Sequence, residues 1–91
     1  MTDESWERFK KLFDKVHPGF LSNIKNKVPP DANLTASDTR ILALMKLQLN
    51  NSEMANVAGI TVEGIKKSKQ RLRKKLGIDA VENLNKFVEN V

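Results

Sequence analysis

The chain has 91 residues, which is enough for one domain with a modest hydrophobic core. It carries 16 Lys and Arg residues against 11 Asp and Glu, a formal net charge of +5, and it has no cysteine. Disulfides, thiolate metal sites and cysteine nucleophiles are therefore excluded, whereas the basic balance suits nucleic acid, an anionic membrane surface or an acidic protein as a partner.

The spacing of apolar residues is helical along the whole chain, and no strand pattern stands out. No apolar run approaches the roughly 20 residues of a membrane span, and the first residues lack the apolar core of a signal peptide. We therefore expect a small all-α protein that is soluble and cytoplasmic.

Two helices are predicted in residues 1–33. The first spans about residues 5–16, where apolar residues recur at helical spacing; they are Trp6, Phe9, Phe13 and Val16. The second follows Pro18, which suits the first turn of a helix, and its stripe consists of Phe20, Leu21, Ile24 and Val28. Pro29 and Pro30 end it, because each proline removes an amide donor and disfavours a helical residue before it.

Four more helices are predicted in residues 34–91. Thr35 with Asp38 is typical of a capping box, and it precedes a wide apolar face. That face consists of Ile41, Leu42, Leu44, Met45 and Leu47. Asn50 with Glu53 gives a second such start, and Asp79 with Glu82 a third. The last helix carries an apolar stripe of Val81, Leu84, Phe87, Val88 and Val91.

The segment 50–77 indicates two helices joined by a tight turn. Gly59 permits the left-handed conformation that ends the first helix, and Gly77 with Ile78 indicates a Schellman-type stop for the second. Thr61 caps the second helix, which spans about residues 62–76. Ala55 supplies the small residue that close approach of two steeply crossing helices needs. The apolar residues expected to hold the pair against the core are Met54, Ala58, Ile60 and Ile65.

The second helix of this pair separates its charged and apolar residues. It carries seven Lys or Arg residues between Lys66 and Lys75. At about 100° per residue, one face consists of Ile65, Ser68, Leu72 and Leu76, with Lys69 at its edge. The opposite face consists of Glu63, Lys66, Lys67, Gln70 and Lys74, flanked by Arg71 and Arg73. A charged face is often only a solvated face, but the capped helix and glycine turn before it favour a helix that enters the DNA major groove.

In helix-turn-helix motifs the beginning of the second helix reaches base edges, while its flanks hold the DNA backbone. We therefore predict base contacts by Glu63, Lys66, Lys67 and Gln70. Because Gln can bond adenine through two hydrogen bonds and Lys can donate to guanine, Gln70 and Lys66 are expected to set specificity. The predicted phosphate contacts are Asn51, Thr61, Arg71, Arg73 and Lys74.

Several of these motifs together resemble the LuxR/FixJ-type helix-turn-helix DNA-binding domain of bacterial transcription regulators. The resemblance covers roughly residues 34–91, and four motifs carry it: Leu34-Thr35 with Asp38, Glu53-Met54-Ala55, Gly59-Ile60-Thr61, and RLRKKLG at residues 71–77. The sequence departs from the family at Gly64, where threonine is usual, and at Ser68, where His or Tyr is common. Glycine inside a helix costs about 1 kcal/mol relative to alanine.

The resemblance implies a LuxR-like four-helix core, residues 34–91, preceded by a lead-in of two N-terminal helices, residues 1–33. It also implies an upstream sensory or regulatory domain and a last helix used for homodimerisation. The candidate dimer interface is the stripe of Val81, Leu84, Phe87, Val88 and Val91. Packing of the same stripe within one chain is the alternative.

The predicted function is sequence-specific binding of double-stranded DNA as the effector domain of a bacterial transcription regulator. One alternative is a sigma-factor-like promoter-reading domain. Another is a protein-interaction domain whose basic helix docks an acidic partner. No enzyme activity or cofactor is expected, because the sequence has no nucleophile–base set, metal-ligand cluster or glycine-rich phosphate loop. His17, the only histidine, is expected to be structural or exposed.

Overall fold

The computed structural model describes residues 3–29 and 31–91, and the side chains of Asp3, Val81 and Glu82 lie outside the described set. This part of the chain contains six helices and no strand, so the predicted all-α fold is confirmed. The helices are α1 (Asp3–Val16), α2 (Phe20–Lys27), α3 (Ala36–Lys46), α4 (Asn51–Ala58), α5 (Val62–Leu76) and α6 (Val81–Glu89). Within the described ranges, none has the length and apolar character that crossing a membrane would require.

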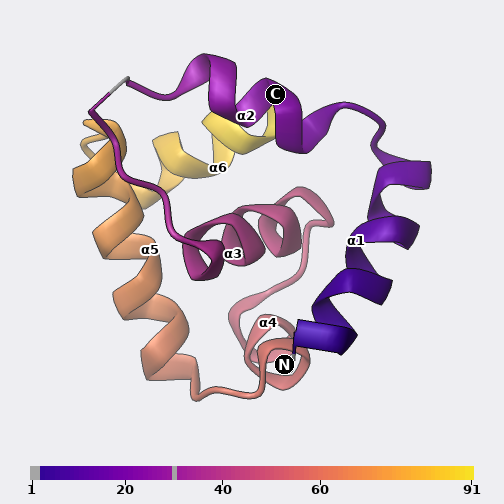
Figure 1. Ribbon diagram of the computed structural model, residues 1–91. Coiled ribbons are helices and arrows are strands. Elements are labelled where there is room, and N and C mark those ends of the chain that lie inside the picture. Colours follow the sequence, from indigo (N-terminus) through magenta and orange to yellow (C-terminus); the bar gives the residue numbers. More distant parts are fainter. Residues whose placement is uncertain (1–2, 30) are drawn as a thin grey trace.

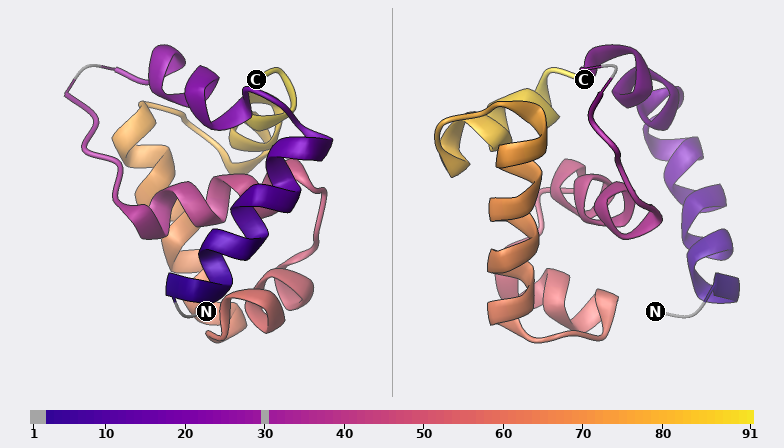
Figure 2. Two further views of the ribbon diagram at one scale, coloured as in Figure 1. Left: turned by 45° about the vertical axis from the view of Figure 1, so that its right-hand side comes forward. Right: turned by 60° about the vertical axis from the view of Figure 1, so that its left-hand side comes forward.

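Helix α3 lies at the centre, and the other five helices surround it (Figures 1 and 2). Its sequence explains this position, because an uninterrupted apolar run from Ile41 to Met45 gives a helix that is apolar on most sides, and such a helix is buried. Every residue of the run is at most 8% exposed. Helices α1 and α5 lie on opposite sides of α3. Helix α1 is therefore separated from α5 by the core.

Aromatic side chains hold α1 and α2 together. The rings of Trp6 and Phe9 stack with centroids 5.4 Å apart, and Phe13 meets Phe20 of α2 edge to face at 5.3 Å. His17 lies between the helices with its ring 5.3 Å from that of Phe13, in agreement with a structural role.

The apolar stripe predicted for α1 is not buried at its last residue, Val16. Val16 is 65% exposed, and it lies one turn from Leu12, which is 64% exposed. The buried line passes instead from Phe13 to Phe20, so the last turn of α1 faces solvent. Pro30, predicted to help end α2, lies outside the described residues.

The helix ends confirm most of the predicted caps. Both hydrogen bonds of the capping box form at Thr35 with Asp38, and both form at Asn50 with Glu53. Gly77 has φ 69°, and the amide of Ile78 donates to the carbonyl of Arg73 at 2.9 Å. This is the hydrogen bond that defines a Schellman stop.

The predicted cap at Asp79 was wrong. Helix α6 begins at Val81 after Ala80, which makes no side-chain cap hydrogen bond. Asp79 instead uses its main-chain carbonyl, which accepts from Nη1 of Arg73 at 2.8 Å. This contact and the Schellman hydrogen bond hold residues 78 and 79 against the end of α5, so the helical turn of α6 starts later. Glu82, the proposed partner in that cap, has no described side chain.

Candidate nucleic-acid interface

Helices α4 and α5 are joined by residues 59–61, and α4 runs across the lower end of α5 (Figure 1). Gly59 adopts φ 72° and ψ 30°, the left-handed conformation that glycine takes without steric cost. Its amide donates to the carbonyl of Ala55 at 2.9 Å, which closes α4. Thr61 then opens α5, because its Oγ1 accepts from the amide of Gly64 at 3.0 Å. The predicted helix–glycine turn–helix is therefore present as local structure.

Helix α5 has a buried side and an exposed side. Ile65 and Leu72 are completely buried and Ser68 is 7% exposed, so this side is held against the core. The opposite side consists of exposed residues: Glu63, Lys66, Lys67, Gln70 and Lys74. Every residue predicted to contact bases therefore lies on the exposed side of one helix.

The exposed side of α5 is largely unpaired. Nζ of Lys66 lies 3.6 Å from Oε1 of Glu63, and both side chains are mostly exposed, so this ion pair contributes little to stability. Among the described residues, Lys67, Gln70 and Lys74 make no side-chain hydrogen bond or ion pair. Their donors are free to meet a ligand without first breaking an internal contact.

One apolar position of the turn differs from the prediction. Met54 is fully buried, and Ala58 is half-buried. Ile60, however, is 44% exposed, so the prediction that it anchors the turn in the core was wrong. A methyl group placed on Gly64 would lie 3.4 Å from Cδ1 of Ile60. The Ile60 side chain thus lies over the position that a side chain at residue 64 would occupy.

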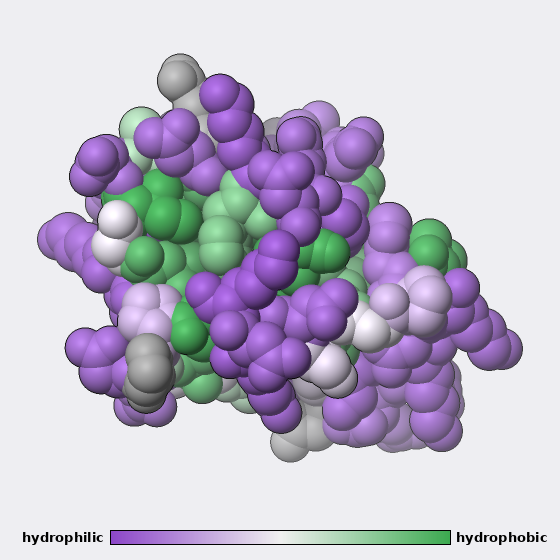
Figure 3. Space-filling view, turned by 90° about the horizontal axis from the view of Figure 1, so that it is seen from above, coloured by the Kyte–Doolittle hydropathy of each residue, from purple (hydrophilic) through white to green (hydrophobic). Residues whose placement is uncertain are grey.

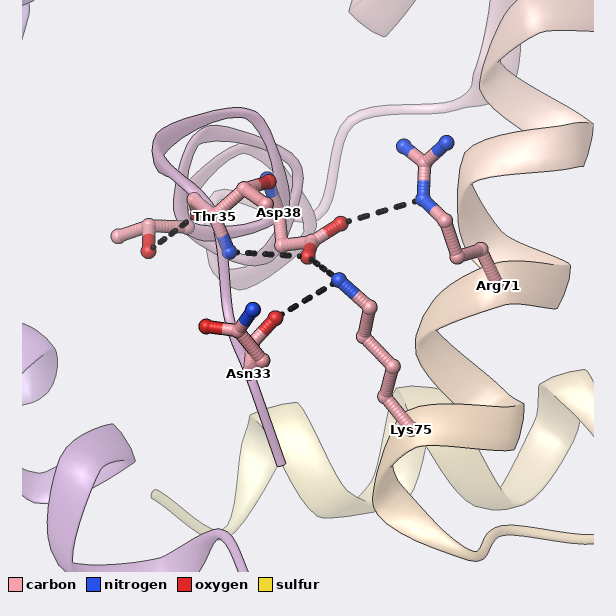
Figure 4. A network of polar contacts seen from close by, with 6 residues as sticks. Asn33, Thr35, Asp38, Arg71 and Lys75 are labelled. Atoms are coloured by element: carbon pink, nitrogen blue, oxygen red, sulfur yellow. Dashed lines mark hydrogen bonds and ion pairs between the residues drawn. The ribbon is translucent and has the colours of Figure 1, made fainter. Parts of the chain in front are cut away.

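A buried carboxylate connects α5 to α3 and to the segment before it (Figure 4). Asp38 is fully buried, its Oδ2 accepts from the amide of Thr35 at 3.0 Å, and the same oxygen accepts from Nζ of Lys75 at 2.5 Å. Lys75 also donates to the main-chain carbonyl of Asn33 at 2.8 Å. Burial by itself raises the pKa of Asp38, but the hydrogen bonds and the positive charge of Lys75 outweigh it and lower the pKa below its ordinary value of 3.8.

Arg71 belongs to the same network but stays accessible. Its Nε lies 3.5 Å from Oδ1 of Asp38, and its side chain is 52% exposed. The two terminal nitrogens of the guanidinium point away from Asp38 (Figure 4). Arg71 can therefore offer these nitrogens to a phosphate while its Nε stays near the carboxylate.

Two predicted phosphate contacts are engaged inside the chain. Oδ1 of Asn51 accepts from Nζ of Lys69 at 2.6 Å, which joins α4 to α5. Burial lowers the pKa of Lys69 below its ordinary value of 10.5. Arg73 is half-buried and donates to the carbonyl of Asp79. We therefore leave Arg73 out of the candidate interface, and Asn51 retains only its amide nitrogen for an outside partner.

The described residues of the apolar stripe of α6 are buried in the core or packed against it. Leu84 and Val88 are at most 1% exposed, whereas Phe87 and Val91 are half-buried and Val81 lies outside the described side chains. Leu84 and Val88 therefore pack within the chain, which was the alternative to a dimer contact. Seen from above, the molecule shows hydrophobic patches at its surface between hydrophilic side chains (Figure 3).

Sequence reasoning missed the part that Lys75 and Lys69 play. Both lysines were counted with the basic run, yet Lys75 reaches the buried Asp38 and Lys69 reaches Asn51. The only sequence signal was the placement of Lys69 at the edge of the apolar face.

Comparisons of the chain with protein-family models, with curated proteins and with solved structures found no match. Among the described residues, no group of three or more His, Cys, Asp or Glu is arranged to hold a metal ion. The candidate interface is therefore assigned from its own geometry.

Proposed function

We propose that this chain binds double-stranded DNA in a sequence-specific manner, with α5 in the major groove. The observation that carries the proposal is the division of α5, which has a buried side anchored by Ile65 and Leu72 and an exposed side rich in unpaired donors. A helix fits the major groove, and donors on its exposed side can reach base edges. The glycine turn after α4 is compatible with a helix-turn-helix of the LuxR/FixJ type.

Within this function the exposed residues divide by position. Lys66, Lys67 and Gln70 lie in the first part of α5 and are proposed to contact bases, with Glu63 beside them. Lys74 and Arg71 lie further along and are proposed to contact phosphates, together with the amides near Thr61. Lys75 and Lys69 support the helix from inside and are not part of the contact surface.

The proposed biological role is the effector domain of a bacterial transcription regulator, which acts in the cytoplasm and receives its signal from an upstream domain. Because one helix-turn-helix makes few base contacts, we also propose that the chain binds as a homodimer to two half-sites. The sigma-factor-like and protein-interaction alternatives are not favoured by any particular contact in the structure.

The test is selection of bound duplexes from a random pool. The parent should enrich one sequence or a pair of half-sites. A variant with Lys66→Gln, Lys67→Gln and Gln70→Ala should lose that enrichment. Gln70→Ala alone should cost about 1–3 kcal/mol of discrimination at one base pair and relax the preference there.

A matched control removes the same number of charges elsewhere. Lys11→Gln with Lys15→Gln changes two exposed lysines of α1, on the other side of α3 from α5. This control should enrich the same sites as the parent. The proposal fails if the α5 variant enriches the parent's sites, or if the parent is retained by heparin but prefers no duplex, which is the behaviour of a protein-interaction domain.

A further inference from the structure

A second candidate site lies at the N-terminal side of the molecule. It is a pocket of about 490 Å³ between α1, α2, residues 29 and 32–34, and the first turn of α3. None of its lining residues belongs to α5. Pockets that hold small molecules have volumes of about 300–1,000 Å³. This pocket is therefore large enough for a small organic ligand.

Most of the described residues that line the pocket are apolar, and two of them belong to the buried core. Trp6 lines it and is only 8% exposed, because Phe9 stacks on its ring and the guanidinium of Arg40 lies 5.4 Å from the ring centroid. Ile24, which is 2% exposed, forms part of α2's wall. The remaining apolar lining residues are Leu21, Val28, Pro29, Ala32, Leu34 and Ala36. Such walls favour an apolar ligand body.

The charged lining residues are all basic. Lys10 comes from α1 and Lys25 from α2, and none of the described Asp or Glu side chains lines the pocket. Nζ of Lys10 lies 3.3 Å from Oε1 of Glu7 in an exposed pair that a ligand can replace at little cost. Lys25 makes no ion pair with the described part of the chain. The two lysines belong to different helices and line the same pocket.

The lysines set the sign of the ligand charge. A lysine ammonium is a point charge that pairs with a carboxylate or a phosphate group alike. Asn33 and Thr39 complete the polar lining. The side-chain amide of Asn33 can add a neutral hydrogen bond to an ionised head group, whereas the Thr39 hydroxyl already donates to the carbonyl of Thr35.

We propose that this pocket binds a small amphipathic anion, with its apolar body against Trp6 and α2 and its anionic head group at Lys10 and Lys25. The two lysines in the lining favour an anionic ligand over a neutral apolar one. The proposal does not rest on DNA binding, because every residue that it uses lies outside α5.

The experiment titrates the full chain with octanoate and, in parallel, with 1-octanol, which has the same alkyl chain and no charge. Trp6 is the only tryptophan, so its fluorescence reports occupancy directly. Octanoate should give a saturable change in Trp6 fluorescence. Because a hydrogen bond to a charged group is lost, 1-octanol should bind roughly tenfold more weakly.

Variants locate the carboxylate. Lys10→Gln with Lys25→Gln should weaken octanoate binding by roughly tenfold or more, while Lys11→Gln with Lys15→Gln, which removes the same charge from exposed positions of α1, should leave it unchanged. Circular dichroism and thermal unfolding establish that each variant is folded. Chemical-shift changes at the Trp6 indole and the Leu21 and Val28 methyl groups provide a second readout of occupancy.

Three results would overturn the proposal. One is the absence of saturable binding by both readouts. The second is equal affinity for octanoate and 1-octanol, which would make the pocket a neutral apolar crevice. The third is unchanged octanoate affinity in the folded Lys10→Gln, Lys25→Gln variant, which would place the ligand elsewhere.

Discussion

Lys75, near the end of α5, places its ammonium group against the fully buried carboxylate of Asp38 at the start of α3. The two residues are 37 positions apart in the chain, and the contact ties the proposed recognition helix to the central helix. Lys75 also holds the carbonyl of Asn33. A carboxylate that does not itself lie on the exposed side of α5 therefore helps to hold this helix against α3.

Asp38→Asn should destabilise the fold by about 2 kcal/mol, because it removes the charge partner of Lys75 while keeping the shape of the side chain. Lys75 is 24% exposed, so its ammonium can still reach water, which limits the loss. Urea unfolding measures the difference. Asp14→Asn, which changes an exposed carboxylate of α1, is the control and should stay close to the parent.

The difference in stability between the parent and Asp38→Asn should depend on pH. The pKa of Asp38 is lowered in the folded protein, so the stabilisation is complete above the ordinary carboxyl value of 3.8 and is lost as the pH falls through the lowered value. The parent should keep its advantage over Asp38→Asn down to about pH 4 and lose it below. A difference between the two proteins that stays constant to the lowest accessible pH would contradict this assignment.

Local hydrogen bonding explains which structural features could be predicted from the sequence. The caps at Thr35 and Asn50 join residues three apart, so their partners are visible in the sequence. The left-handed turn at Gly59 was likewise predictable, because a glycine at this position is enough to indicate it. The helical spacing of apolar residues then predicted all six helices.

Tertiary contacts explain which features could not be predicted. Asp38 was recognised as a capping residue, but its contact with Lys75 depends on how α3 and α5 pack. Arg73 was assigned to the DNA backbone from its place on the helix, yet the chain after the Schellman stop returns close enough to offer it the carbonyl of Asp79. Exposed positions on α5 were predicted correctly because they follow from the helix period alone.

Gly64→Ala tests the least typical position of α5. Alanine should stabilise the helix by about 1 kcal/mol relative to glycine. The new methyl group would lie 3.3 Å from Oγ1 of Thr61 and 3.4 Å from Cδ1 of Ile60. Because Ile60 is 44% exposed, its side chain can move aside, and we expect a net stabilisation of less than about 1 kcal/mol by thermal unfolding.

The double variant Gly64→Ala, Ile60→Ala separates the two effects. Removing most of the Ile60 side chain leaves only Thr61 near the new methyl group. If crowding by Ile60 is real, Gly64→Ala should stabilise the Ile60→Ala background more than it stabilises the parent. An equal effect in both backgrounds would show that Ile60 does not restrict this position.

Lys74 offers the cleanest test of a phosphate contact, because it is exposed and makes no ion pair with the described residues. Lys74→Gln should weaken binding to every duplex by the same factor. It should also reduce the slope of log K against log salt by about 0.9, the value for one released phosphate contact. Fluorescence anisotropy over a series of salt concentrations measures both quantities.

Arg71→Gln is a useful contrast to Lys74→Gln. It should reduce the salt slope similarly, but it should also lower stability, since Arg71 lies 3.5 Å from the Asp38 carboxylate. Lys11→Gln on α1 should leave the slope unchanged. A salt slope that Lys74→Gln and Lys11→Gln alter equally would mean that α5 is not the face that meets the phosphates.

The burial pattern of α6 separates its structural role from dimerisation. Leu84 is completely buried, so Leu84→Ala should destabilise the monomer by about 2–4 kcal/mol at any protein concentration. Phe87 is half-buried, so Phe87→Ser should leave the chain folded but weaken self-association on DNA with two half-sites. Sedimentation with such a duplex, its half-sites about 34 Å apart, measures the number of bound chains. A parent that binds as a strict monomer both on and off this duplex would exclude the dimer and leave α6 with its packing role alone.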